Sequence, residues 1–496
     1  HELHIPFHGN DAIDAVEHHQ WARTIDLHNL PNNSEHATPV SPNNSHIDEH
    51  TNLGYLSQCD PRMRDDLPRL KGVSSAKRDA VFQQKLQLCS VKFDLLDPKT
   101  NSKHVEIKRE TLLELKDYVN SPSGQKIFKE DNIPAIISMV RVNIFRALPK
   151  PKGVIDLEDE EMFQEPSWPH LQIVYDFLLR FVMSAEVSAK VAKRHIDQQF
   201  CLCLINLFES EDVNEREYLK TILHRIYGKI MHHRGFIRRS ISNSFYRFVY
   251  ETDYHPGIAE LLEILGSIIN GFAKPLKAEH VSFLKRALLP LHKPRNIKYY
   301  HQHLAYCAVQ FVEKDIDTVI PIVKSMCKWW PWTSSAKQLL LLAELEEILE
   351  ACSSAMSHSS MSPADLKELK EMVARLLAQC VGSVHFQVAE RSLMFWNNEH
   401  LIGGGGVLSM AGADVLLAPM LAPARRHADG HWNAVIERLA QNLLKMFMDQ
   451  DPELFQKCTE EQQKMEAERS KRREATERRW ELLRARAEEI GGASES

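Results

Sequence analysis

The chain has 496 residues, of which 43% are hydrophobic, so it can bury a large core but is too long for one simple compact domain. Lys and Arg number 61 against 67 Asp and Glu, giving a net charge of -6, so no overall attraction to nucleic acid is expected. The nine cysteines are irregularly spaced, mostly within apolar helical patterns. They predict free thiols in a reducing, intracellular setting.

No apolar run reaches the roughly 20 residues that a membrane-spanning helix needs. The first residues also lack the charged-then-apolar pattern of a signal segment. We therefore expect no membrane span and a cytoplasmic location, with the nucleus left open.

Residues 1–80 are rich in His, Asn, Pro, Ser and Asp and show no sustained helical or strand period, so they predict a disordered N-terminal extension. Residues 81–457 differ, because apolar residues recur there at helical spacing in segment after segment. One such stripe comprises Ile258, Leu261, Leu262, Leu265, Ile268, Ile269 and Phe272.

Proline and glycine separate these segments, as at Pro149, Pro166, Pro256-Gly257 and Pro331. Neighbouring pairs of segments recur about every 40 residues, the period of helix-pair repeats. The pattern predicts an all-α fold, an α-solenoid of stacked helix pairs. A compact multi-helix bundle remains the alternative.

Two later segments depart from the repeats. Gly403–Gly406 opens a weakly patterned stretch to about Gly430, which predicts a loop insertion. Residues 458–496 are rich in Glu, Lys, Arg and Ala, with opposite charges three or four apart, and predict an exposed helix and tail. The basic cluster at 469–473 has two interpretations, a solvated helix face, which we favour, and a nuclear address.

The sequence contains no motif typical of an enzyme. A Gly-x-Ser-x-Gly elbow, a Walker loop, a kinase signature and His-Glu-x-x-His are all missing. His232 and His233 are adjacent, so on a helix they point about 100° apart and cannot chelate one ion. We therefore expect no catalytic residues, no metal site and no cofactor.

The densest functional signal lies between residues 219 and 272. Its first half combines basic and aromatic side chains: His224, Tyr227, Lys229, Arg234, Arg238 and Arg239. In the second half Ile264 and Ile268 are four apart and form an apolar ledge. Two such helices side by side suit a short peptide with apolar anchors and a carboxylate. By chemistry alone the ordinary interpretation, buried isoleucines and solvated arginines, is favoured.

Long strings in this region and later in the chain resemble the B-prime regulatory subunit family of protein phosphatase 2A. The resemblance extends from about Cys89 to about Cys458 and rests on these strings: TILHRIYGK at 221–229, FYRFVYET at 245–252, GIAELLEILGSIINGF at 257–272, LLPLHK at 288–293 and HFQVAER at 385–391.

The resemblance implies a curved stack of HEAT-like helix pairs that is not itself catalytic. It implies partnership with a scaffold subunit and a catalytic subunit, and recruitment of substrate proteins through a groove that reads Leu-x-x-Ile-x-Glu peptides. The family's groove residues correspond here to His224, Arg225, Tyr227, Arg234, Arg238, Ile264 and Ile268. Tyr227 and the isoleucines are expected to line apolar pockets, and His224, Arg225 and Arg234 to hold the motif glutamate. Arg238 and Lys229 would then favour acidic or phosphorylated flanks.

The resemblance also draws attention to an acidic loop, formed by Asp156, Glu158, Asp159, Glu160 and Glu161. We expect it either to face the catalytic subunit and tune substrate access or to be a solvated surface loop, with equal weight. Leu345, Ile348 and Glu350 match the peptide code literally, but their apolar helical stripe predicts that they are packed. The competing function is a HEAT-repeat scaffold or transport adaptor without a phosphatase partner.

Overall fold

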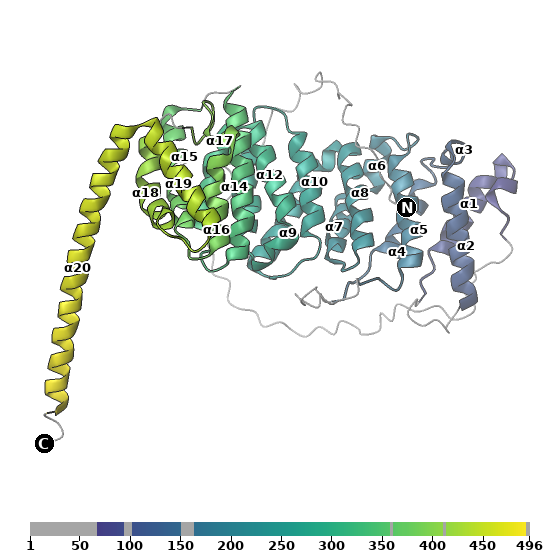
Figure 1. The fold of residues 1–496 in the computed structure, drawn as a ribbon. Helices are drawn as coiled ribbons and strands as arrows, with labels where there is room; N and C mark the ends of the chain where they lie inside the picture. Colours follow the sequence, from purple (N-terminus) through teal and green to yellow (C-terminus); the bar gives the residue numbers. More distant parts are fainter. Residues whose placement is uncertain (1–66, 94–101, 150–162, 358–360, 410–412, 493–496) are drawn as a thin grey trace, which may run out of the picture. The chain divides into compact units, whose positions relative to one another are not determined.

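The computed structural model describes residues 67–93, 102–149, 163–357, 361–409 and 413–492 (Figure 1). Throughout these ranges the regular structure is helical, and none of the described residues lies in a strand. The predicted all-α class is therefore confirmed. The predicted disorder of residues 1–80 falls largely outside the described ranges, although helix α1 begins at Ser75, before the expected boundary.

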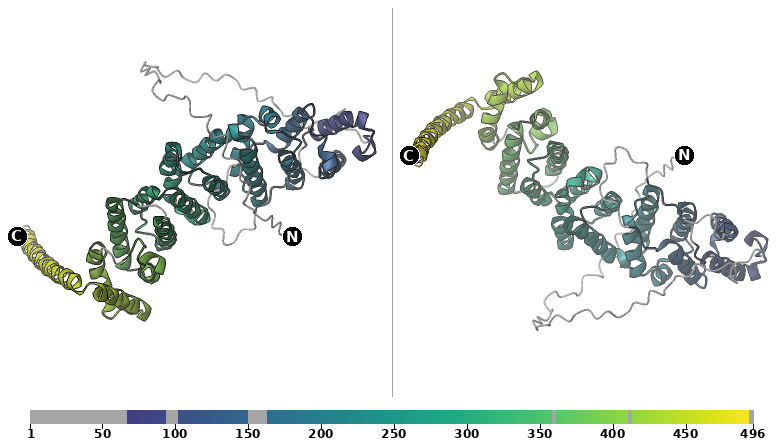
Figure 2. Two further views of the ribbon diagram at one scale, coloured as in Figure 1. Left: turned by 90° about the horizontal axis from the view of Figure 1, so that it is seen from above. Right: turned by 90° about the horizontal axis from the view of Figure 1, so that it is seen from below.

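The long helices form two packed rows, and each row follows the chain order (Figures 1 and 2). Row one consists of α1 (Ser75–Cys89), α4 (Ile133–Ile144), α7 (Gln198–Asn206), α9 (Arg234–Tyr250), α13 (Val319–Lys328), α15 (Pro363–Val381) and α18 (Ala413–Ala428). Row two consists of α2 (Ser102–Val119), α5 (Trp168–Met183), α8 (Val213–Lys229), α10 (Ile258–Asn270), α12 (His301–Lys314), α14 (Ser335–Met356), α16 (Phe386–Met394) and α19 (Ala434–Gln450).

Shorter helices connect the rows. They are α3 (Pro122–Gln125), α6 (Ala189–His195), α11 (Ala278–Phe283) with the π-helical turn Leu284–Leu288, and α17 (Glu399–Ile402). Turns of 3-10 helix lie at Leu70–Gly72, Leu207–Glu209, Met231–His233, Leu289–His292, Arg295–Tyr299, Ile316–Thr318 and Phe395–Asn397. Helix α20 (Pro452–Gly492) follows the last pair.

Each helix packs mainly on its sequence neighbours and on the equivalent helix of the next pair. This is the arrangement of a solenoid, in which one pair cannot bury its apolar face alone but a stack can. The stripe predicted in α10 lies inside the stack, since Leu261, Leu265 and Ile269 are all fully buried.

The loop insertion predicted after Gly403 is wrong in its second half. Residues 413–428 form α18, which contains Pro419 and Pro423 within its length. Leu417, Met420 and Leu421 are buried there, and α18 packs on both α15 and α19. Burial of this apolar face outweighs the weak helical propensity that the two prolines produce.

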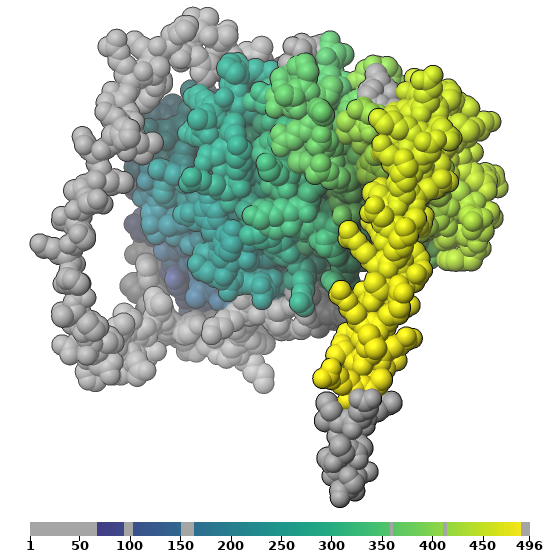
Figure 3. All heavy atoms as spheres, turned by 90° about the vertical axis from the view of Figure 1, so that its left-hand side faces the viewer, coloured from purple at the N-terminus to yellow at the C-terminus, as the bar shows by residue number. Residues whose placement is uncertain are grey.

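The C-terminal charged segment is helical, as predicted, but the helix starts earlier, at Pro452. Its first turns contact α18 and α19, and every residue from 463 to 487 is exposed (Figure 3). Within the described ranges, no helix has the length and apolar character required to cross a bilayer.

Candidate peptide-binding surface

The seven predicted groove residues come from the end of α8, the beginning of α9 and the second half of α10. The turn Met231–His233 reverses the chain between α8 and α9, so Tyr227 and Arg234 face each other across it. The start of helix α8 is stabilised by an N-cap, because the Asp212 carboxylate accepts hydrogen bonds from the amides of Asn214 and Glu215.

Tyr227 is the centre of a basic and aromatic cluster. The guanidinium carbon of Arg234 lies 5.2 Å from the centre of the Tyr227 ring, a cation–π contact. Arg234 Nε also donates to the carbonyl of Tyr227 at 3.0 Å, while Arg238 Nη1 donates to the Tyr227 hydroxyl at 3.0 Å. Both arginines are thus held in place around one ring, which is 9% exposed.

The two arginines differ in which guanidinium nitrogens remain available to a ligand. Arg234 uses Nε and Nη2 on backbone carbonyls, and its Nη1 has no partner among the described residues. Arg238 is partly neutralised, because its Nη2 donates to the Glu279 carboxylate at 3.2 Å. Arg234 is therefore the better candidate to bind an incoming carboxylate.

His224 connects α8 with α10. Its Nε2 lies 3.0 Å from the Ser267 hydroxyl, and burial, helped by the neighbouring Arg225 charge, lowers the pKa of His224. Arg225 itself is exposed and has no partner in the described part of the chain. At neutral pH the C-terminal half of α8 therefore presents the neutral imidazole of His224 beside the unpaired guanidinium of Arg225.

Ile264 and Ile268 belong to the hydrophobic core in this structure, at 2% and 5% exposed. No open socket is therefore formed by them here, and their role as pocket walls stays a prediction. Next to them Phe272 stacks on the His280 imidazole, with ring centres 3.8 Å apart.

Sequence reasoning missed Ser267 and Glu279, which contact the predicted residues His224 and Arg238. Nothing in the local pattern distinguishes them, since α11 reaches Arg238 only through the tertiary fold. It also misplaced Lys229, which was expected to favour acidic flanks. The Lys229 ammonium donates to the carbonyls of Val182 and Ser184 at the end of α5, so it stabilises that helix terminus.

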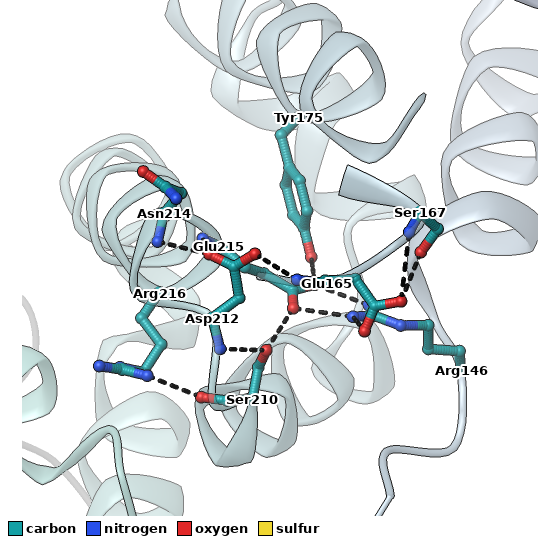
Figure 4. Close-up of polar contacts among 9 residues, drawn as sticks. All are labelled: Arg146, Glu165, Ser167, Tyr175, Ser210, Asp212, Asn214, Glu215 and Arg216. Atoms are coloured by element: carbon teal, nitrogen blue, oxygen red, sulfur yellow. Dashed lines mark hydrogen bonds and ion pairs between the residues drawn. The ribbon is translucent and has the colours of Figure 1, made fainter. Parts of the chain in front are cut away.

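The acidic loop at 156–161 lies outside the described residues, and its regulatory role stays a prediction. The residues on either side of it are firmly held (Figure 4). Arg146 Nη2 lies 3.3 Å from the Glu165 carboxylate. Arg146 also donates to Glu215 in the first turn of α8, and the Glu165 amide donates to Asp212, the residue before that helix. The literal match at 345–350 is packed as expected, since Leu345 and Ile348 are fully buried.

Comparison with known proteins identifies the family. Residues 67–487 match the family described as "Protein phosphatase 2A regulatory B subunit (B56 family)". The chain belongs to this family. It is 50% identical over 430 residues to the B' eta isoform of the 59 kDa regulatory subunit of serine/threonine protein phosphatase 2A from Arabidopsis thaliana, covering 85% of this chain and 81% of the relative.

Two further relatives are also named regulatory subunits of protein phosphatase 2A. The B' alpha isoform of the 57 kDa regulatory subunit from Arabidopsis thaliana is 46% identical, covering 86% of this chain and 84% of the relative. The delta isoform of the 56 kDa regulatory subunit from Oryctolagus cuniculus is also 46% identical, covering 84% and 69%. The resemblance inferred from the sequence is confirmed, and this B56-family chain is a non-catalytic regulator with a phosphatase as its partner.

Proposed function

We propose that this chain joins a scaffold subunit and a catalytic subunit in a protein phosphatase 2A holoenzyme and brings substrate proteins to it. Recruitment would use Leu-x-x-Ile-x-Glu peptides bound where α8, α9 and α10 meet. The observation that carries this proposal is the cluster around Tyr227, where Arg234 keeps free donors and Arg225 is unpaired.

The physical fit is between the motif glutamate and these cations. A hydrogen bond to a charged group contributes roughly 1.5–3 kcal/mol, and the guanidinium of Arg234 is oriented before the peptide arrives. The apolar anchors of the peptide would require side-chain movement around Ile264 and Ile268, because both are buried in the free chain.

The test is a calorimetric titration of the full chain with a synthetic Leu-x-x-Ile-x-Glu peptide. Arg234→Glu should weaken binding at least about tenfold, since a favourable contact becomes a repulsion. Arg239→Glu is the matched control, because Arg239 is exposed on the same helix and has no described partner. Equal affinity of Arg234→Glu and the unmodified chain, with both folded by circular dichroism, would count against this surface.

The alternative adaptor function is separated by a second measurement. The chain is recovered from cell extract with its partners, and serine/threonine phosphatase activity is assayed in the recovered material. Activity supports the holoenzyme, whereas recovery without activity supports the adaptor. The cytoplasmic location, with the nucleus left open, stays a prediction.

A further inference from the structure

Helix α20 continues well beyond the part that the stack covers (Figure 1). Its first turns pack on α18 and α19, and Cys458 in these turns is only 9% exposed. We define distal α20 as residues 463–487, all of which are exposed. At 1.5 Å per residue this segment extends about 37 Å. A helix of this length that the stack leaves uncovered is a surface available to another molecule.

Distal α20 differs from the rest of the chain in its charge. It contains nine Lys and Arg against five Glu, a net charge of +4, in a chain whose net charge is -6. The segment therefore produces a local positive potential that the net charge of the whole chain does not show.

The charges of distal α20 are sorted by side of the helix. Positions three, four or seven apart share a side. This spacing puts six residues on one side, which we call the basic face: Met465, Arg469, Arg472, Arg479, Trp480 and Leu483. No Glu falls within that arc, whereas Glu474, Glu477 and Glu481 fall on the other side. The three arginines of the basic face are exposed, and none of them forms an ion pair within the described ranges.

The basic face continues the side by which the first turns of α20 pack. Met465 follows Cys458 by seven positions, or two helical turns, so the two side chains point the same way. The stack covers this side at Cys458, but Met465, Trp480 and Leu483 are 56%, 60% and 59% exposed. Three large apolar side chains held in water among arginines indicate a partner that offers apolar atoms next to negative charge.

The residue types of the basic face select among possible partners. A second copy of the same helix would place Arg472 and Arg479 against identical arginines, and like charges repel. A nucleic-acid backbone would attract the arginines but offers no apolar surface to Met465 and Leu483. A membrane surface with anionic lipids offers both, because its negative head groups lie directly above acyl chains. Trp is enriched at the depth of the head groups.

We propose that distal α20 binds in the plane of a membrane surface that contains anionic lipids, with the basic face toward the lipid and the Glu474 side toward water. The helix lies on the bilayer and does not cross it, in agreement with the lack of a membrane-spanning helix in the described ranges. The proposal goes beyond the proposed function and does not depend on it. The candidate peptide surface belongs to α8, α9 and α10 and remains open when α20 is bound.

The test is cosedimentation of the full chain with vesicles of phosphatidylcholine alone and with vesicles that also contain about 30% phosphatidylserine. The chain should bind the anionic vesicles and not the neutral ones, and added salt should release it. Arg472→Glu with Arg479→Glu should weaken binding by at least about thirtyfold, because each cation near an anionic surface contributes roughly fivefold in affinity.

Lys471→Glu with Arg478→Glu is the matched control, because it changes the net charge equally but on a side of the same helix away from the basic face. It should weaken binding by less than about fivefold, since the reversed charges stay farther from the lipid. Trp480→Ser with Leu483→Ser keeps every charge and should weaken binding about tenfold, because the apolar contact with the acyl boundary is lost. All three variants should keep the circular dichroism spectrum and melting temperature of the unmodified chain.

No binding to anionic vesicles, or equal binding to neutral and anionic ones, would overturn the proposal. Equal weakening by the two charge variants would also overturn it, since net charge and not the basic face would then cause the attraction. Binding to a single-stranded oligonucleotide without binding to vesicles would assign the basic face to nucleic acid instead.

Discussion

At the scale of single residues, Glu344 is the most consequential buried charge. Its side chain is fully buried in α14 and accepts hydrogen bonds from His292 Nε2 and His301 Nε2, each at 2.9 Å. The other ring nitrogen of His292 faces the Leu289 carbonyl at 2.8 Å. Carboxylate and carbonyl oxygens only accept, so both nitrogens of His292 must donate and its ring must be charged.

The pKa values agree with this geometry. Burial alone would lower the pKa of His292, but the charge and hydrogen bond of Glu344 outweigh it and raise that pKa. Burial alone would raise the pKa of Glu344, yet His292 and His301 lower it to about 2. The pair therefore stabilises the fold fully between about pH 4.5 and 6.5, the two ordinary pKa values.

Glu344→Gln should lower the free energy of unfolding by about 3–5 kcal/mol, because it leaves a buried imidazolium without its counter-charge. This loss in the free energy of unfolding should be largest near pH 6. It should shrink as the pH rises through the elevated pKa of His292, because the unmodified chain then loses the ion pair as well. Urea unfolding of both chains at pH 6, 7 and 8.5 measures the loss. Glu368→Gln, whose pairing with Lys324 is exposed, should cost under about 1 kcal/mol. A deficit that does not vary with pH would contradict the ionic origin.

At the scale of elements, one carboxylate ties α8 to α5 and to the segment that follows α4 (Figure 4). Glu215 in α8 accepts two hydrogen bonds from Arg146, which follows α4, at 2.6 and 2.8 Å. It accepts another from the Tyr175 hydroxyl of α5 at 2.7 Å. Burial would raise the pKa of Glu215, but Arg146 and the hydroxyl donors lower it.

Glu215→Gln should therefore destabilise the stack by about 3–5 kcal/mol, since it leaves Arg146 without its counter-charge. The loss should be local, because stacked repeats open in neighbouring units. Hydrogen exchange should accelerate in α4, α5 and α8 and remain slow in α14–α16. Glu217→Gln, an exposed position on the same helix, is the control. Uniform acceleration across all pairs would show that the stack unfolds as a single unit.

At the scale of the whole molecule, the first turns of α20 pack on the stack and contribute to its stability, whereas the rest of α20 does not. Phe455 and Thr459 in the first turns of α20 contact Arg425 of α18. Beyond Gln462 all residues through Ala487 are exposed.

A chain ending at Gln462 should unfold at the same temperature as the full chain, because no buried area is lost. A chain ending at Asp451 should be less stable by about 1–3 kcal/mol, since it loses the packing of Phe455. Calorimetric melting of the three chains checks both statements. Equal destabilisation by both truncations would show that the exposed helix packs on the stack.

The candidate peptide surface was predictable only in part. Residues such as Tyr227, Arg234 and Arg238 were found because a family resemblance marked them, and the structure brings them around one ring. The partners Ser267 and Glu279 were not predictable, and Lys229 was misassigned because its acceptors lie in α5, more than 40 positions earlier in the chain.

The all-α class, the helix-pair repeats and the family could be predicted from the sequence, because helical periodicity and matching strings are local properties. Which charges meet, and the helical state of residues 413–428, depend instead on the tertiary structure. The physical reason is distance along the chain. A contact between residues some 40 positions apart depends on how successive helix pairs stack. A short sequence pattern contains no information about that stacking.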